Sequence, residues 1–138
     1  MIKVGDILEE WDFTVEAGKV REFALAIHDP HWKEGNFAPP TFPVVASACF
    51  VERLVTSILD LDRSRTVHGE HQYSYSRPIR VGDRLKCRAR LVADETKTGR
   101  RGGTMRIVTT EVEFRCADTG VSVCRETMKS VEKAPGSP

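Results

Sequence analysis

The segment from Phe42 to Leu59 is the least polar part of the chain, and it constrains the fold more than any other feature. No charged residue occurs between Phe42 and Val51. Pro43 falls in the expected first turn, where its missing N–H has no cost, and Thr41 is suited to be the N-cap. Because a helix that is apolar on all sides is normally buried on all sides, we expect this helix to be surrounded by the rest of the protein.

Four strand-like runs follow this helix and supply a surface that could surround it. They cover residues 67–77, 84–93, 105–115 and 121–131. Short turns separate them, and short turns between consecutive strands favour antiparallel pairing. In the second run, apolar residues alternate with Lys86, Arg88 and Arg90, so one face of the sheet should be apolar and the other wet.

The chain before the long helix adds one strand and one short helix. Residues 8–15 have the alternation of a strand, and residues 17–27 have helical spacing that Pro30 should end. This order predicts an α+β hot-dog fold, in which a curved antiparallel sheet wraps around one long central helix. We expect a single domain over residues 1–132 and a disordered tail over residues 133–138, which are rich in Pro, Gly and Ser.

The composition of the 138 residues is that of an ordinary globular protein, with 40% apolar and 30% charged residues. A net charge of +1 argues against nucleic-acid binding. With no long apolar run and no leader, we expect no membrane span and a cytoplasmic location. The cysteines lack metal-binding spacing, so we expect reduced thiols, no metal and no cofactor; they are Cys49, Cys87, Cys116 and Cys124.

Four short segments of the chain are distinctive. They are Val4–Asp6, Val20–Ala24, Ala38–Phe42 and Arg77–Leu85. Together they resemble the N-terminal, HadA-like type of the MaoC-like hydratases and dehydratases, and the resemblance covers roughly residues 3 to 130. It implies a dimer of hot-dog subunits that hydrates trans-2-enoyl thioesters, or dehydrates (3R)-hydroxyacyl thioesters, of coenzyme A or acyl carrier protein.

The same resemblance implies a catalytic motif, Asp-x-Asn-Pro-x-His, whose Asp and His position and activate water. At that place the chain has Asp29 and His31, which match in type and order, but the Asn is absent and the spacing is three residues shorter. Pro30 favours an extended backbone at Asp29, so one water could contact both side chains. We therefore expect Asp29 and His31 to be catalytic; the alternative is a helix end followed by a turn of surface residues.

The start of the long helix predicts a site for the thioester oxygen. A helix start presents unpaired N–H groups and a partial positive charge. Since Pro43 has no N–H, Phe42 and Val44 beside Thr41 are the expected donors. The resemblance also implies that the thioester carbonyl lies here. The alternative is a helix whose first N–H groups are already bonded by Thr41.

Two further groups of residues invite a functional interpretation. Lys97, Arg100 and Arg101 lie in a glycine-rich loop, and their charges would suit the phosphates of coenzyme A or of a carrier-protein arm. The alternative is a solvated hairpin tip that keeps the sheet edge soluble. His68 and His71 are three apart on a strand, so we expect them to point to opposite faces and to form no metal site.

Three functions remain open. The chain could be an active (R)-specific hydratase or dehydratase, a non-catalytic substrate-binding subunit of a heterodimeric dehydratase, or a hot-dog thioesterase. The altered motif favours the second, and the lack of an acidic residue in the first half of the 42–59 helix argues against the third. We expect a homodimer, or a heterodimer with a second hot-dog subunit.

Overall fold

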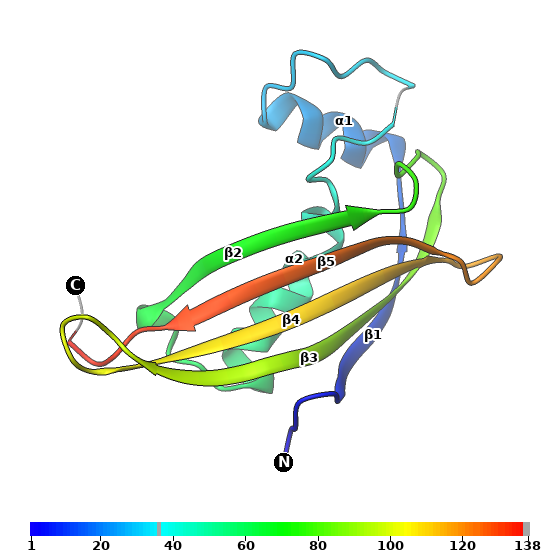
Figure 1. The fold of residues 1–138 in the computed structure, drawn as a ribbon. Helices are drawn as coiled ribbons and strands as arrows, with labels where there is room; N and C mark the ends of the chain where they lie inside the picture. The colour runs from blue at the N-terminus through cyan, green and yellow to red at the C-terminus, as the bar shows by residue number, and fades with distance from the viewer. Residues whose placement is uncertain (36, 137–138) are drawn as a thin grey trace.

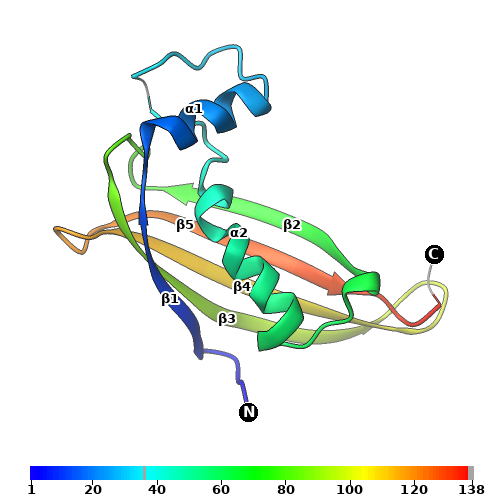
Figure 2. The same ribbon diagram turned by 180° about the vertical axis from the view of Figure 1, so that it is seen from behind.

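The computed structural model describes residues 1–35 and 37–136. Its strands form one five-stranded antiparallel sheet in the order β1-β3-β4-β5-β2. Helix α2 lies across the concave face of this sheet, and α1 lies beyond one end of it (Figures 1 and 2). The predicted α+β hot-dog fold is therefore confirmed. The elements are β1 (Ile7–Thr14), α1 (Ala17–Ala26), α2 (Pro43–Arg53), a π-helical turn (Leu54–Ile58), a 3-10 turn (Arg63–Arg65), β2 (Thr66–Tyr75), β3 (Arg84–Thr98), β4 (Thr104–Cys116) and β5 (Ser122–Glu132).

Strand β3 shows most clearly how the sequence specifies the sheet. Its apolar residues from Leu85 to Leu91 are buried in alternation with exposed charged residues, as the pattern predicts. The strand runs on to Thr98, however, so the prediction that Lys97 lies in a loop is wrong. Lys97 is paired with Met105 of β4. Pairing with β4 keeps these polar residues in a strand. The local pattern of apolar and polar residues alone does not reveal this pairing.

The core lies between the sheet and one side of α2. Phe50 and Leu54 of this helical segment are 1% and 0% exposed. Trp11 of β1 stacks on Phe50 with ring centroids 5.5 Å apart, and its indole N–H donates to the Ala46 carbonyl at 3.0 Å. Burying each large apolar side chain stabilises the fold by roughly 1.5–3 kcal/mol, so this side of the helix fixes its position on the sheet.

The opposite side of α2 corrects the expectation that the helix is buried all round. Ala48 and Cys49 are exposed, and Val45 and Val51 are only partly buried. The reason is geometric, because a sheet of one chain covers one side of a helix and leaves the other open. An apolar sequence here therefore coexists with an uncovered apolar face.

Helix α1 ends earlier than Pro30 alone would require. His28 has a positive φ of 54°, a conformation that ends a helix. The Asp29 N–H donates to the Ala24 carbonyl at 3.1 Å, and the His28 N–H donates to the Leu25 carbonyl at 3.2 Å. These two bonds form a Schellman motif, so the helix stops at Ala26.

The predicted tail begins with a residue that is bonded to the body of the protein. The Lys133 N–H donates to the Arg65 carbonyl at 2.9 Å, and the Arg65 guanidinium donates to the Lys133 carbonyl. Ser137 and Pro138 of this tail, like Asn36 of the predicted loop, lie outside the described residues. All four cysteines are free thiols, as expected.

Within residues 1–35 and 37–136, the helices are too short or too polar to span a bilayer.

Candidate functional site

The segment just before α2 lines a shallow, mainly apolar depression of about 310 Å³. The Ala38 N–H donates to the Ile79 carbonyl at 2.8 Å, which ties the segment before the helix to the segment after β2. The Tyr75 hydroxyl donates to the Pro40 carbonyl, and burial raises the pKa of Tyr75 well above its ordinary value. Tyr75 is therefore a neutral donor that closes one side. The lining consists of Ala38, Pro40, Tyr75, Ser76, Arg77, Pro78 and Ile79.

The backbone donors at this helix start differ from those expected. Phe42 is the N-cap, and its N–H donates to the Pro39 carbonyl at 2.9 Å. The Val44 N–H donates to the Thr41 carbonyl at 3.2 Å. By contrast, the Thr41 N–H donates to none of the described residues. The turn over residues 39–44 thus engages the N–H groups of Phe42 and Val44, while that of Thr41 has no acceptor among the described residues. This result depends on turn geometry rather than on residue type.

Asp29 and His31 lie on the loop that follows α1. Asp29 is half-buried and His31 is exposed. An Asp29 carboxylate oxygen accepts the backbone N–H of His31 at 2.9 Å. An aspartate that accepts the backbone N–H of the residue two positions later forms an Asx-turn, which is a common turn type. In the isolated chain the carboxylate therefore engages the His31 backbone, as the turn alternative describes.

The basic residues expected to bind phosphates lie at the other end of the sheet. Lys97 is near the end of β3, and Arg100 and Arg101 are in the β3–β4 turn. Figure 1 places this hairpin at the end of the sheet opposite to α1. A single chain therefore does not bring these three residues together with Thr41 or Asp29.

The segment after β2 that supports the resemblance has a structural role. The Asp83 carboxylate accepts the Arg77 guanidinium and the backbone N–H of Arg80, both at 2.8 Å. The hydrogen bond to Asp83 raises the pKa of Arg77. Gly82 has a φ of 92°, which this turn requires and which other residues rarely adopt. The turn presents the buried Ile79 whose carbonyl holds the start of α2.

The two histidines of β2 are side by side, so the prediction that they face opposite sides is wrong. Their rings are 5.0 Å apart, and His71 Nδ1 lies 3.2 Å from His68 Nε2. The register shifts between His68 and Glu70, and this bulge turns His68 to the side of His71. A Cβ on Gly69 would lie 3.0 Å from Val131 Cγ2, so a larger residue at the bulge would have to displace that side chain. Among the described residues no group of three metal-ligating side chains occurs.

Glu126 of β5 is a buried carboxylate that sequence reasoning missed. Its side chain is 1% exposed, and its Oε2 lies 3.0 Å from Nε2 of His71. The two atoms are close enough for an ion pair when His71 is protonated, but neither makes a directed hydrogen bond with a described residue. The available signal was the alternation of Cys124, Glu126 and Met128, which places an acidic residue on the inward face of a strand.

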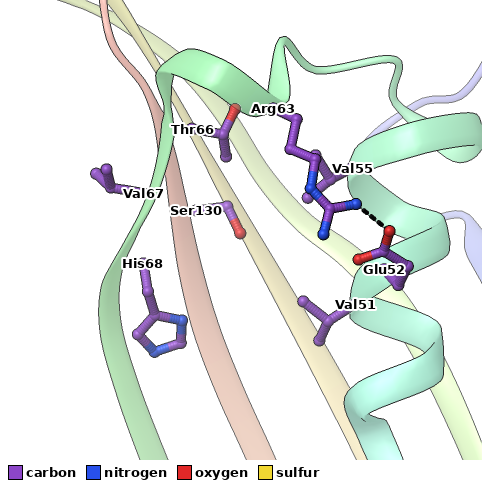
Figure 3. A pocket seen from close by; sticks show the side chains of 8 residues that line it. All are labelled: Val51, Glu52, Val55, Arg63, Thr66, Val67, His68 and Ser130. Atoms are coloured by element: carbon purple, nitrogen blue, oxygen red, sulfur yellow. Dashed lines mark hydrogen bonds and ion pairs between the residues drawn. The ribbon is translucent and has the colours of Figure 1, made fainter.

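His68 lines a cavity of about 210 Å³ at the far end of α2 (Figure 3). Val51 and Val55 form its apolar wall on the helical side. Ser130 is the β5 partner of His68 and also lines the cavity. An ion pair between Arg63 and Glu52 closes one side. The cavity therefore combines an apolar wall with polar groups on β2 and β5.

A curved antiparallel sheet that holds one helix is the architecture of a hot-dog protein. Comparison with protein families places the chain within this class. It belongs to the MaoC-like dehydratases, since the family model for the FAS1-like dehydratase domain region matches residues 3–125.

The curated relatives carry no activity in their names. The chain is 38% identical over 103 residues to a UPF0336 protein of Thermobifida fusca, covering 63% of this chain and 66% of the relative. It is 33% identical over 135 residues to a UPF0336 protein of Saccharopolyspora erythraea, covering 87% of this chain and 86% of the relative. The alignment thus spans just under two thirds of the first relative and most of the second.

Solved structures confirm the fold. A MaoC-like dehydratase superposes with a TM-score of 0.80 at 23% identity, covering 96% of this chain and 42% of that one. A chain of the HadBC (3R-hydroxyacyl-ACP dehydratase) complex of Mycobacterium tuberculosis superposes with a TM-score of 0.74 at 20% identity, covering 93% of this chain and 96% of that one. At these identities the likeness is one of fold.

Proposed function

We propose that the chain holds acyl thioesters and takes part in (R)-specific hydration of trans-2-enoyl thioesters or dehydration of 3-hydroxyacyl thioesters. The observation that carries this proposal is the segment just before α2. Pro40 lines the apolar depression, and the N–H of the next residue, Thr41, donates to none of the described residues. The family to which the chain belongs, named for a dehydratase region, supports the class of reaction.

The chemistry assigns distinct tasks to these groups. Adding water across an enoyl thioester builds negative charge on the thioester oxygen, which N–H donors at a helix start stabilise. Thr41 supplies the free donor, and Phe42 and Val44 can add theirs by sharing or exchanging their turn bonds. Asp29 and His31 are the residues that would position water and transfer its proton.

The proposal includes a second hot-dog subunit. Strand β2 is at the edge of the sheet, paired only with β5 among the described strands, and one side of α2 is uncovered. Unpaired strand edges and apolar helix faces are surfaces that a partner covers. Two copies related by a two-fold axis and paired through β2 would place the Lys97 hairpin of one subunit near the α1 end of the other. The basic loop could then reach a thioester held by the partner.

A specific observation favours a second candidate, a substrate-binding subunit without its own catalysis. The Asp29 carboxylate is engaged by the His31 backbone N–H rather than held ready for water. The motif is also three residues shorter than the complete one. In this version the partner supplies the acid and base, and this chain supplies the helix start and the acyl site.

One assay separates these candidates. The purified chain is incubated with crotonyl-coenzyme A, alone and with a hot-dog chain that carries the complete motif, and loss of the enoyl absorbance is followed. Activity of the chain alone that disappears in Asp29→Asn and His31→Ala, but not in the control Glu70→Gln, supports catalysis by this chain. Activity that arises only with the partner supports the binding subunit. Release of free thiol, or no activity and no thioester binding in either mixture, contradicts the proposal.

A further inference from the structure

We propose that the acyl group bound by this chain carries an uncharged polar group, a hydroxyl or carbonyl, at its far end, and that Glu126, His71 and His68 bind that group. The inference rests on the proposed function and goes beyond it by naming the class of acyl group. A site for a plain alkyl chain would be apolar along its length, whereas this one places a buried carboxylate and two imidazoles beside the helix.

Aromatic rings follow one another along β2. The ring centroids of Tyr75 and Tyr73 are 6.4 Å apart, those of Tyr73 and His71 are 4.6 Å apart, and those of His71 and His68 are 5.0 Å apart. Tyr75 bonds Pro40 at the start of α2, and His68 lines the cavity at the far end of the helix. A thioester held at the helix start and extended along β2 would therefore pass these rings and end near His68.

The buried pair of Glu126 and His71 lacks directed hydrogen bonds. Glu126 Oε2 and His71 Nε2 are both buried, and neither has a directed hydrogen bond to any residue the structure describes. Buried polar atoms in native proteins are nearly always bonded, and leaving one unbonded is costly. A ligand hydroxyl can donate to the carboxylate, and a ligand hydroxyl or carbonyl can accept from the imidazole. A plain alkyl end would leave both atoms with no hydrogen-bonding partner beyond each other.

The charged groups near the cavity favour an uncharged ligand end. Arg63, the cation at the cavity edge, is paired with Glu52 (Figure 3). Glu126 does not line the cavity but contacts His71, whose ring is 5.0 Å from that of His68, so an anionic ligand end at His68 would lie near an acidic side chain. His68 and Ser130 add hydrogen-bonding groups on neighbouring strands. The cavity therefore suits an uncharged polar end and disfavours an anionic one.

The test measures binding of saturated acyl-coenzyme A thioesters, which cannot be hydrated, to the full chain by calorimetry. Octanoyl, decanoyl and dodecanoyl thioesters are each compared with the ω-hydroxy and ω-carboxy forms. For at least one chain length we expect the hydroxylated thioester to bind roughly tenfold to hundredfold more tightly than the plain one, as for a hydrogen bond to a charged group. The carboxylated form should bind no more tightly than the plain one.

Variants assign the effect to these residues. In Glu126→Gln and His71→Asn the preference for the hydroxylated thioester should fall at least several-fold, with little change for the plain thioester. The control Glu70→Gln changes an exposed carboxylate of β2, next to His71, and should keep the preference. Thermal unfolding of each variant checks that it is folded, and the wild-type comparison stands even if one variant is not.

The outcomes separate the two proposals. If no acyl thioester binds, alone or with a partner, the proposed function and this inference are both overturned. If plain and hydroxylated thioesters bind equally at every length, or if the preference survives in Glu126→Gln, only this inference is overturned.

Discussion

The short loop of residues 29–31 that follows α1 and the inner face of β2 use their polar groups differently. The loop carries the residues that match the family motif, yet Asp29 bonds a neighbouring backbone N–H and His31 is exposed. Strand β2 matches no motif, yet its His71 faces a carboxylate that is 1% exposed. In this protein, therefore, the residues recognisable by their spacing and the residues under the strongest physical constraint are different sets.

The largest effect should come from removing the buried carboxylate. Glu126→Ala leaves His71 without its partner and opens a space in the core, so we expect the free energy of unfolding to fall by about 3 kcal/mol. Asp29→Ala removes one half-buried turn bond and should lower it by about 0.5–1.5 kcal/mol. Urea denaturation at pH 7 measures both. Equal losses would show that the two regions are under similar constraint and would contradict the comparison.

A second substitution tests the other segment that resembles the family. Asp83→Asn keeps the shape of the side chain but removes the charge that accepts from Arg77 and from the Arg80 backbone. Hydrogen bonds to charged groups contribute about 1.5–3 kcal/mol, so we expect a loss of about 2 kcal/mol in the free energy of unfolding. Arg84→Gln, which changes an exposed ion pair nearby, should cost less than 1 kcal/mol. If Asp83→Asn lowers the free energy of unfolding by no more than Arg84→Gln does, this turn has no structural role.

The sequence predicts the fold well because alternation and composition report burial directly. The inward residues of β3 and the apolar α2 segment are examples. What it could not predict is which side of α2 stays open, since the segment is apolar on all sides and only the extent of the sheet decides. The exposed Cys49 and the buried Phe50 are neighbours in the sequence and look equally apolar in it.

The candidate site is less predictable for two physical reasons. The free donor at Thr41 results from turn bonds made by Phe42 and Val44, which residue types do not specify. The side-by-side position of His68 and His71 results from a bulge, and one extra residue in a strand reverses the side of every residue before it. Regular strand geometry therefore gives the wrong answer at this point.

A third substitution tests whether the bulge keeps the β2 histidines together. A Cβ on Gly69 would lie 3.0 Å from Val131 Cγ2 and 3.3 Å from the Lys129 carbonyl, so Gly69→Ala needs a small shift of the Val131 side chain or of the strand. We expect a loss of about 1–2 kcal/mol in the free energy of unfolding. Carbon and nitrogen NMR shifts of the His68 and His71 rings should change with it. Gly18→Ala, in the exposed part of α1 with nothing near its Cβ, is the control and should not destabilise the protein.

The smallest effect on stability should come from alkylating the cysteines of the folded chain. The same experiment should separate the buried from the accessible thiols by their rates of reaction. Burial raises the pKa of Cys87 and of Cys124 to about 12, so both stay protonated and covered at neutral pH. Hydrogen bonds from Thr119 lower the pKa of Cys116, which increases its reactive thiolate at any pH below its ordinary value.

Iodoacetamide at pH 7.5, followed by peptide mass mapping, should therefore label Cys116 and the exposed Cys49 well before the other two. As the pH rises, the alkylation rate of Cys116 should reach its plateau at a lower pH than the alkylation rate of an ordinary thiol does. Cys49 extends the comparison to the open side of α2, because a second hot-dog subunit seated there would shield it and leave Cys116 reactive. Labelling of Cys87 or Cys124 as fast as Cys49 would contradict the burial of the core, and a partner that leaves Cys49 fully reactive would contradict docking on this side of the helix.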